Sequence, residues 1–157
     1  MKHIKTLLLV ALAFAFVPAY AQDEPADNME VLKDMVQADK KLVIADSMDL
    51  TQSEADAFWP VYDEYQDKLA EINKRYGDVI KAYAEGYNAM SLDDESALAL
   101  MKTTMKIEKD ESKLKQKYYR KLKKVLPGMK VVRYLQIENK LRAIIKYELA
   151  MGIPLNE

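Results

Sequence analysis

Cysteine is absent from this chain of 157 residues, and histidine occurs once, at His3. Thiolate and imidazole are the usual transition-metal ligands, so their scarcity argues against such a site. Without thiols no disulfide can form, and stability must come from packing. The four glycines form no phosphate-binding loop, and no GxSxG motif occurs. We therefore expect no catalytic residues, no cofactor and no metal site.

Long apolar runs are confined to the first residues of the chain. The basic start MKHIK precedes an apolar stretch from Leu7 to Val17, and Ala19-Tyr20-Ala21 then fits a signal-peptidase site. This stretch is shorter than the ~20 residues that a membrane-spanning helix needs. We therefore predict a signal peptide over residues 1–21, export to the periplasm, and a mature chain without stable membrane insertion.

Charge in the predicted mature chain is nearly balanced. Removing the signal peptide leaves 22 basic and 25 acidic side chains, a net charge of −3, in 136 residues. This length suits one domain. Residues 22–28 (QDEPADN) are acidic and show no apolar period, which predicts a flexible leader before a helical domain over residues 29–157.

An apolar residue at every third or fourth position predicts one long helix over residues 52–86. Thr51 and Glu54 predict a capping box at its start. Pro60 predicts a kink near residues 56–59. Five tyrosines on its apolar face favour a shallow or partly exposed groove over a sealed core. The apolar face consists of Phe58, Tyr62, Tyr65, Leu69, Ile72, Tyr76, Val79, Tyr83 and Tyr87.

Three further helices are predicted, over residues 29–48, from an N-cap at Ser91 to about residue 125, and from Pro127 to about residue 151. No segment alternates as a strand does, so we predict an all-α fold, an elongated four-helix bundle. The predicted inward residues are Val31, Met35, Ala38, Leu42 and Ala45 in the first of these helices, Leu100, Thr104, Ile107, Glu111, Leu114, Tyr118, Leu122 and Val125 in the second, and Val131, Tyr134, Leu135, Ile137, Leu141, Ile144, Ile145 and Leu149 in the third.

The segment KLKQKYYRKLKK, residues 113–124, carries seven cations in twelve residues. Nucleic-acid binding would suit these residue types, but the export signal and the negative net charge argue against it. Two interpretations remain, a solvated helix face or a surface that attracts acidic and apolar protein segments. The candidate client-binding residues are Lys113, Lys115, Lys117, Tyr118, Tyr119, Arg120, Lys121 and Lys124.

Met101 and Met105 lie one helical turn apart. Two thioethers at this spacing can bind Cu(I), but methionines with this pattern more often fill a core. We predict that both are core residues, with Cu(I) buffering as an alternative that equilibrium dialysis would test.

Taken together, these features resemble the Spy/CpxP-type periplasmic proteins with LTxxQ motifs. The motif reads Leu50-Thr51-Gln52-Ser53-Glu54 here, with Glu54 where the family usually has glutamine. A second copy, Leu126-Pro127-Gly128-Met129-Lys130, keeps only Leu126. The resemblance covers residues 29–151. It implies a stress-response chaperone that works without ATP, forms a cradle-shaped antiparallel homodimer and binds unfolded exported proteins on a basic, partly apolar surface.

Two functions are therefore alternatives. The first is a holdase, which shields many unfolded clients without a cofactor. The second is an envelope-stress regulatory or structural interaction protein, which binds one folded partner.

Overall fold

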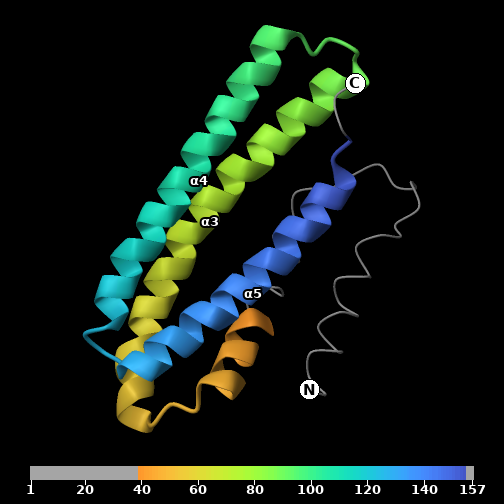
Figure 1. The fold of residues 1–157 in the computed structure, drawn as a ribbon. Coiled ribbons are helices and arrows are strands. Elements are labelled where there is room, and N and C mark those ends of the chain that lie inside the picture. Colours follow the sequence, from red (N-terminus) through yellow and green to blue (C-terminus); the bar gives the residue numbers. More distant parts are fainter. Residues whose placement is uncertain (1–38, 155–157) are drawn as a thin grey trace, which may run out of the picture. The chain divides into compact units, whose positions relative to one another are not determined.

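The computed structural model describes residues 39–154. The predicted signal peptide, the acidic leader and the inward residues Val31, Met35 and Ala38 lie outside this range. Every regular element within it is a helix (Figure 1). These elements are a short helix over residues 39–48, α3 (Gln52–Asn88), α4 (Asp94–Leu122) and α5 (Gly128–Gly152). The predicted all-α helical bundle is confirmed.

The start of α3 is fixed by the predicted capping box. The Thr51 side chain accepts a hydrogen bond from the Glu54 amide, and the Glu54 carboxylate accepts one from the Thr51 amide at 2.9 Å. Just before it, Asp49 has a φ of 46°, a left-handed conformation that turns the chain out of the short helix. Pro60 lies inside α3, and the helix continues across it.

α4 begins two residues later than predicted, because Asp93 and not Ser91 is its N-cap. The Ser96 amide donates to the Asp93 carboxylate at 2.9 Å, and the Ser96 hydroxyl accepts from the Asp93 amide at 3.1 Å. The Ser91 amide is used instead at the end of α3, where it donates to the Gly86 carbonyl at 3.0 Å. α4 ends at Leu122, before the predicted position, and Pro127 is the N-cap of α5.

The three long helices lie side by side. α3 and α4 pack closest to each other as an antiparallel hairpin, and α5 runs parallel to α3 (Figure 1). Lys130 at the start of α5 binds the Glu54 carboxylate at 2.5 Å, near the start of α3. Beyond the other end of α5, the Tyr83 hydroxyl donates to the Pro154 carbonyl at 2.9 Å.

The core lies toward the start of α3 and is rich in aromatic rings. Tyr134 of α5 meets Phe58 and Tyr62 edge-on, with ring centres 5.3 and 6.0 Å apart, and Tyr118 of α4 lies 5.1 Å from Tyr65. Because Tyr62 and Tyr65 are 3% and 2% exposed, the prediction of a shallow groove is wrong for this half of α3. The buried cluster is Ile44, Met48, Phe58, Tyr62, Tyr65, Leu69, Tyr118, Leu122, Leu126, Val131 and Tyr134.

The short helix attaches to α3 at Trp59, the only tryptophan of the chain. The Lys41 ammonium lies 5.1 Å from the centre of the half-buried indole and binds the Asp63 carboxylate at 2.6 Å. Ile44 and Met48 are the buried residues of this helix, so Leu42, two positions from Ile44, faces the opposite side and is 68% exposed. The predicted inward positions Leu42 and Ala45 are therefore wrong.

The predicted inward face of α5 holds only for its first half. Val131 and Tyr134 are buried, whereas Ile144, Ile145 and Leu149 are exposed. The second half of α5 carries apolar side chains on every side of the helix, and the α3–α4 hairpin can cover only one of these sides. Among residues 39–154, an apolar surface is consequently left exposed at this end.

Candidate functional site

The basic segment, residues 113–124, covers the last part of α4 and the two residues after it, and one predicted client contact within it is wrong. Tyr118 is 1% exposed, and its hydroxyl donates to the Glu64 carbonyl at 3.4 Å. It lies on the inward face of α4, four residues from both Leu114 and Leu122. Its ring is therefore part of the core and cannot contact a client.

Three of the predicted cations are engaged within the bundle. Lys121 binds the Glu64 carboxylate at 2.7 Å, Lys113 lies 3.8 Å from the Asp110 carboxylate, and Lys115 donates to the Asn139 side chain. The hydrogen bond from the Lys121 ammonium holds the pKa of Glu64 below its ordinary value. The remaining candidates are exposed: Lys117, Tyr119, Arg120 and Lys124, with Lys123 beside them.

A shallow depression of about 340 Å³ lies between α3 and α4 and is partly lined by the basic segment. Arg75 binds Asp110 across it at 3.0 Å, and Lys68 binds Glu71 at 2.7 Å on its rim. The four cations outnumber the two carboxylates, so the depression favours an anionic group. Its lining is Lys68, Glu71, Ile72, Arg75, Asp110, Lys113, Leu114 and Lys117.

An exposed apolar stripe runs along α4. Leu98, Met101 and Met105 follow each other at steps of three and four residues, and their exposed fractions are 71%, 56% and 57%. This spacing places all three on one side of the helix. The prediction that Met101 and Met105 fill the core is therefore wrong.

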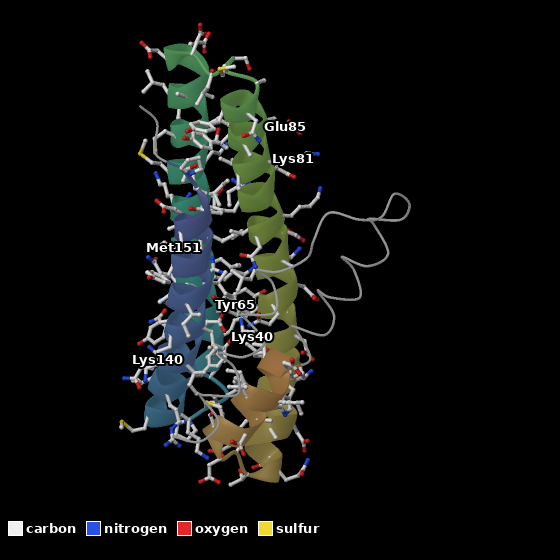
Figure 2. All side chains as sticks on the ribbon, turned by 90° about the vertical axis from the view of Figure 1, so that its right-hand side faces the viewer. Lys40, Tyr65, Lys81, Glu85, Lys140 and Met151 are labelled. Atoms are coloured by element: carbon white, nitrogen blue, oxygen red, sulfur yellow. The ribbon has the colours of Figure 1, made fainter. Side chains whose placement is uncertain are left out.

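A second apolar stripe runs along α5 with the same spacing. Ile144, Tyr147 and Met151 are exposed by 43%, 63% and 71%. In Figure 2, Met151 lies on α5, on the side of the bundle away from α3. We call the two stripes together the α4/α5 face: Leu98, Met101, Met105, Ile144, Tyr147 and Met151.

Because α4 and α5 are antiparallel, the end of the α4 stripe at Met105 lies level with the end of the α5 stripe at Met151. Glu111 of α4 pairs with Arg142 and Lys146 of α5. Continuing this register brings Met105 level with about residue 150, whereas Met101 and Leu98 lie further along the bundle, beyond the level of Met151. At about 100° per residue, both stripes fall on the outer side of the α4–α5 pair, away from α3.

Beneath this face, a group of polar side chains joins α5 to the hairpin. The Arg142 guanidinium lies 2.5 Å from the Glu111 carboxylate as an ion pair and donates to Asn73 at 3.1 Å, while Lys146 lies 3.4 Å from Glu111. Burial alone would raise the pKa of Glu111, but Arg142 and Lys146 outweigh it and hold this pKa below its ordinary value. The polar Glu111 on the predicted apolar face of α4 is thereby explained.

The residues of the LTxxQ-like motif help to hold the fold together, by packing in the core or by forming an ion pair. Leu126 is 6% exposed, and Leu50 packs against the same core. Lys130, in the degenerate second copy, donates to both the Glu54 carboxylate and the Asp49 carbonyl, at 2.5 and 2.7 Å. Glutamate instead of glutamine at position 54 thus supplies a charge that Lys130 neutralises.

Residues 39–154 contain no group of three or more acidic or histidine side chains arranged to hold a metal ion. In the same range, no helix has the length and apolar character needed to cross a membrane. No family model, no curated protein and no solved structure matches this chain.

Proposed function

We propose that this protein is a periplasmic holdase that shields unfolded or partly folded exported proteins without ATP. The observation that carries the proposal is the α4/α5 face, where α4 and α5 each carry three large apolar side chains that are 43% to 71% exposed. Single exposed apolar residues are ordinary, but contiguous apolar patches mark surfaces that bind other proteins.

The composition of the α4/α5 face suits clients of varied sequence. Three of its six residues are methionines, whose flexible, polarisable side chains adapt to different apolar partners. Tyr147 adds a ring that combines an apolar surface with a hydroxyl group. Such a surface selects exposed apolar segments in general and not one partner shape.

The exposed part of the basic segment would add electrostatic attraction. Lys117 and Arg120 are exposed on α4, and Lys123 and Lys124 are exposed just after it; Lys117 also lines the depression that favours anionic groups. Cations accelerate the encounter with acidic segments, and apolar contacts then slow dissociation. Part of the α4/α5 face and most of the basic segment lie along α4, so a single extended client can reach both.

A homodimer is part of the same proposal, because the resemblance to Spy/CpxP-type proteins implies one. Pairing of two copies would bring two α4/α5 faces into one particle and increase the number of contacts with a long client. Sedimentation velocity at several concentrations tests it, and a monomer at every concentration would contradict the dimer while leaving the holdase proposal in place.

The first test measures aggregation of a chemically denatured client by light scattering, with purified protein and no ATP. We expect suppression at near-stoichiometric amounts for two unrelated clients. If neither client is protected, the holdase proposal is wrong. The alternative, a regulatory or structural protein with one folded partner, would then be tested by crosslinking in the periplasm.

A pair of variants locates the activity on the α4/α5 face. Replacing Ile144 and Tyr147 by serine should weaken suppression several-fold, because both side chains are already exposed and their loss scarcely affects packing. The matched control replaces Leu42 and Val132, which are 68% and 47% exposed outside the face, by serine. Equal losses in both variants would show that the face has no special role.

A further inference from the structure

Methionine supplies all the sulfur in this chain, which has no cysteine. Within residues 39–154, Met48 is buried, whereas the other methionines are exposed by 56% to 94%. Methionine is ordinarily among the residues found inside proteins. Three of the exposed methionines belong to the α4/α5 face: Met101, Met105 and Met151.

We propose that these three methionines are a modification site at which peroxide switches off client binding. The inference rests on the proposed holdase function and names a way to regulate the same surface. The α4/α5 face would bind clients while its thioethers are reduced, and would release them when the thioethers become sulfoxides.

The chemistry needs only hydrogen peroxide as oxidant. The thioether sulfur attacks one peroxide oxygen, an S–O bond forms and the O–O bond breaks. The departing oxygen leaves as water after proton transfer from the peroxide itself. Each sulfur loses two electrons and each peroxide gains two, so one peroxide is consumed and one water is released for each methionine sulfoxide.

Exposure decides which methionines react. The side chains of Met101, Met105 and Met151 are 56%, 57% and 71% exposed, so peroxide reaches their sulfur atoms without any opening of the fold. Met48 is 0% exposed and is protected by the core. Oxidation therefore changes the surface and leaves the aromatic core intact.

The consequence follows from the polarity of the product. A sulfoxide is a polar, chiral group that accepts hydrogen bonds, whereas a thioether is apolar and adaptable. Oxidation would convert three of the six side chains of the α4/α5 face in this way. Burying those oxygens against an apolar client segment would then cost free energy, because the client offers no donors.

The test compares three proteins before and after treatment with hydrogen peroxide. These are the unmodified chain, a triple variant with Met101→Leu, Met105→Leu and Met151→Leu, and the control Met129→Leu. Leucine keeps the size and apolar character of methionine but cannot be oxidised. Met129 is 82% exposed at the start of α5, far from the α4/α5 face along that helix. Peptide mass spectrometry counts the sulfoxides, and circular dichroism checks the helices.

We expect oxidation to raise the amount of unmodified protein needed for half-suppression of aggregation on the order of tenfold. The Met129→Leu control should lose activity equally, and the triple variant should keep it. Full activity of the unmodified protein carrying all three sulfoxides would overturn the inference. So would an equal loss in the triple variant.

A second readout separates this inference from the holdase proposal. Binding of a hydrophobic fluorescent dye reports the apolar surface directly, without any client. If the reduced protein fails to suppress aggregation, the holdase proposal fails. Lower dye binding after oxidation, absent in the triple variant, would still support the loss of apolar surface at these three methionines, and unchanged dye binding would overturn the inference.

Discussion

Glu111 occupies a position on α4 between Ile107 and Leu114, where an apolar residue would continue the inward face. The Glu111 side chain is 18% exposed, and its carboxylate lies between the cations of Arg142 and Lys146. Arg142 is itself only 15% exposed, so each charge depends on the other for compensation. This contact joins the second half of α5 to the hairpin by charge, in contrast to the aromatic packing of Tyr134 in the first half.

Replacing Glu111 by glutamine should lower the free energy of unfolding at neutral pH by roughly 1–3 kcal/mol, because it leaves a half-buried cation without its counter-charge. Urea denaturation measures the change. The control Glu71→Gln removes an exposed pair with Lys68 and should change stability little. Equal losses in both variants would contradict the assigned role of Glu111.

The loss of stability in Glu111→Gln should depend on pH in a defined direction. The pKa of Glu111 in the folded protein lies below its ordinary value of 4.5, so its contribution is complete above about pH 4.5 and is lost as the pH falls through the folded value. The stability difference between the unmodified protein and Glu111→Gln should therefore shrink in acid. A difference independent of pH would show that the carboxylate charge is not its cause.

The buried tyrosines predict a loss of stability in alkali. Burial raises the pKa values of Tyr62, Tyr65 and Tyr134. Burial, together with a hydrogen bond to Glu64, raises the pKa of Tyr118 to about 12. The folded protein therefore keeps protons that the unfolded chain releases near pH 10, and stability falls as the pH rises from 10 toward 12. Tyrosinate absorbance should appear together with loss of helical circular dichroism. Complete ionisation near pH 10 with native helicity would contradict this.

At the scale of the element, each of the three long helices has a different kind of N-cap. α3 has its threonine–glutamate capping box, α4 has an aspartate–serine pair that performs the same exchange, and α5 begins at a proline without a side-chain cap. The first could be predicted because Thr51 and Glu54 match a common pattern. The second was missed because the serine is three residues after the N-cap, where the usual capping box has glutamate or glutamine.

Glycine 77 in the middle of α3 offers a test of helix propensity alone. A Cβ atom added at Gly77 meets nothing within 4 Å, so Gly77→Ala should raise the free energy of unfolding by about 0.5–1 kcal/mol. At Gly86 the same atom would lie 3.1 Å from Leu92 Cδ1, so Gly86→Ala should gain less or lose stability. Thermal denaturation compares them. A destabilising Gly77→Ala would show that this part of α3 is more crowded than the structure indicates.

At the scale of the whole domain, the periodic patterns predicted where the helices lie in the sequence better than they predicted which side of each helix packs against the others. The inward face of α3 was predicted correctly at Phe58, Leu69 and Ile72, because its apolar stripe is narrow and has one possible orientation. The second half of α5 has apolar residues all round, so its sequence does not say which side faces the hairpin. The α4/α5 face could not be predicted for the same reason, since it depends on which stripes remain uncovered.

The basic segment can be tested at this scale with a better choice of residues than sequence alone allows. Reversing Lys117, Arg120 and Lys124 to glutamate should weaken client capture several-fold at low salt and little at high salt, because salt screens the attraction. Lys121 is left unchanged, since a glutamate there would face Glu64 and disturb the bundle. Light scattering at two ionic strengths measures capture.

The control for this charge reversal makes the same change in net charge elsewhere. It replaces Lys74, Lys102 and Lys106, all exposed and outside the basic segment, by glutamate. Circular dichroism should show equal helicity in both variants. If capture at low salt is unchanged by reversing Lys117, Arg120 and Lys124, the basic segment has no part in binding clients.

The position of Trp59 gives the domain a natural fluorescent probe. The indole lies among Lys41 of the short helix and the rings of Phe58 and Tyr62, 5.0 and 5.3 Å away. The emission of Trp59 will therefore change when the short helix detaches from α3. Trp59 lies far along α3 from Tyr83, whose hydroxyl binds the chain just after α5. Intrinsic fluorescence can thus follow one end of the bundle while a client or an oxidant acts on the other, with no dye and no engineered label.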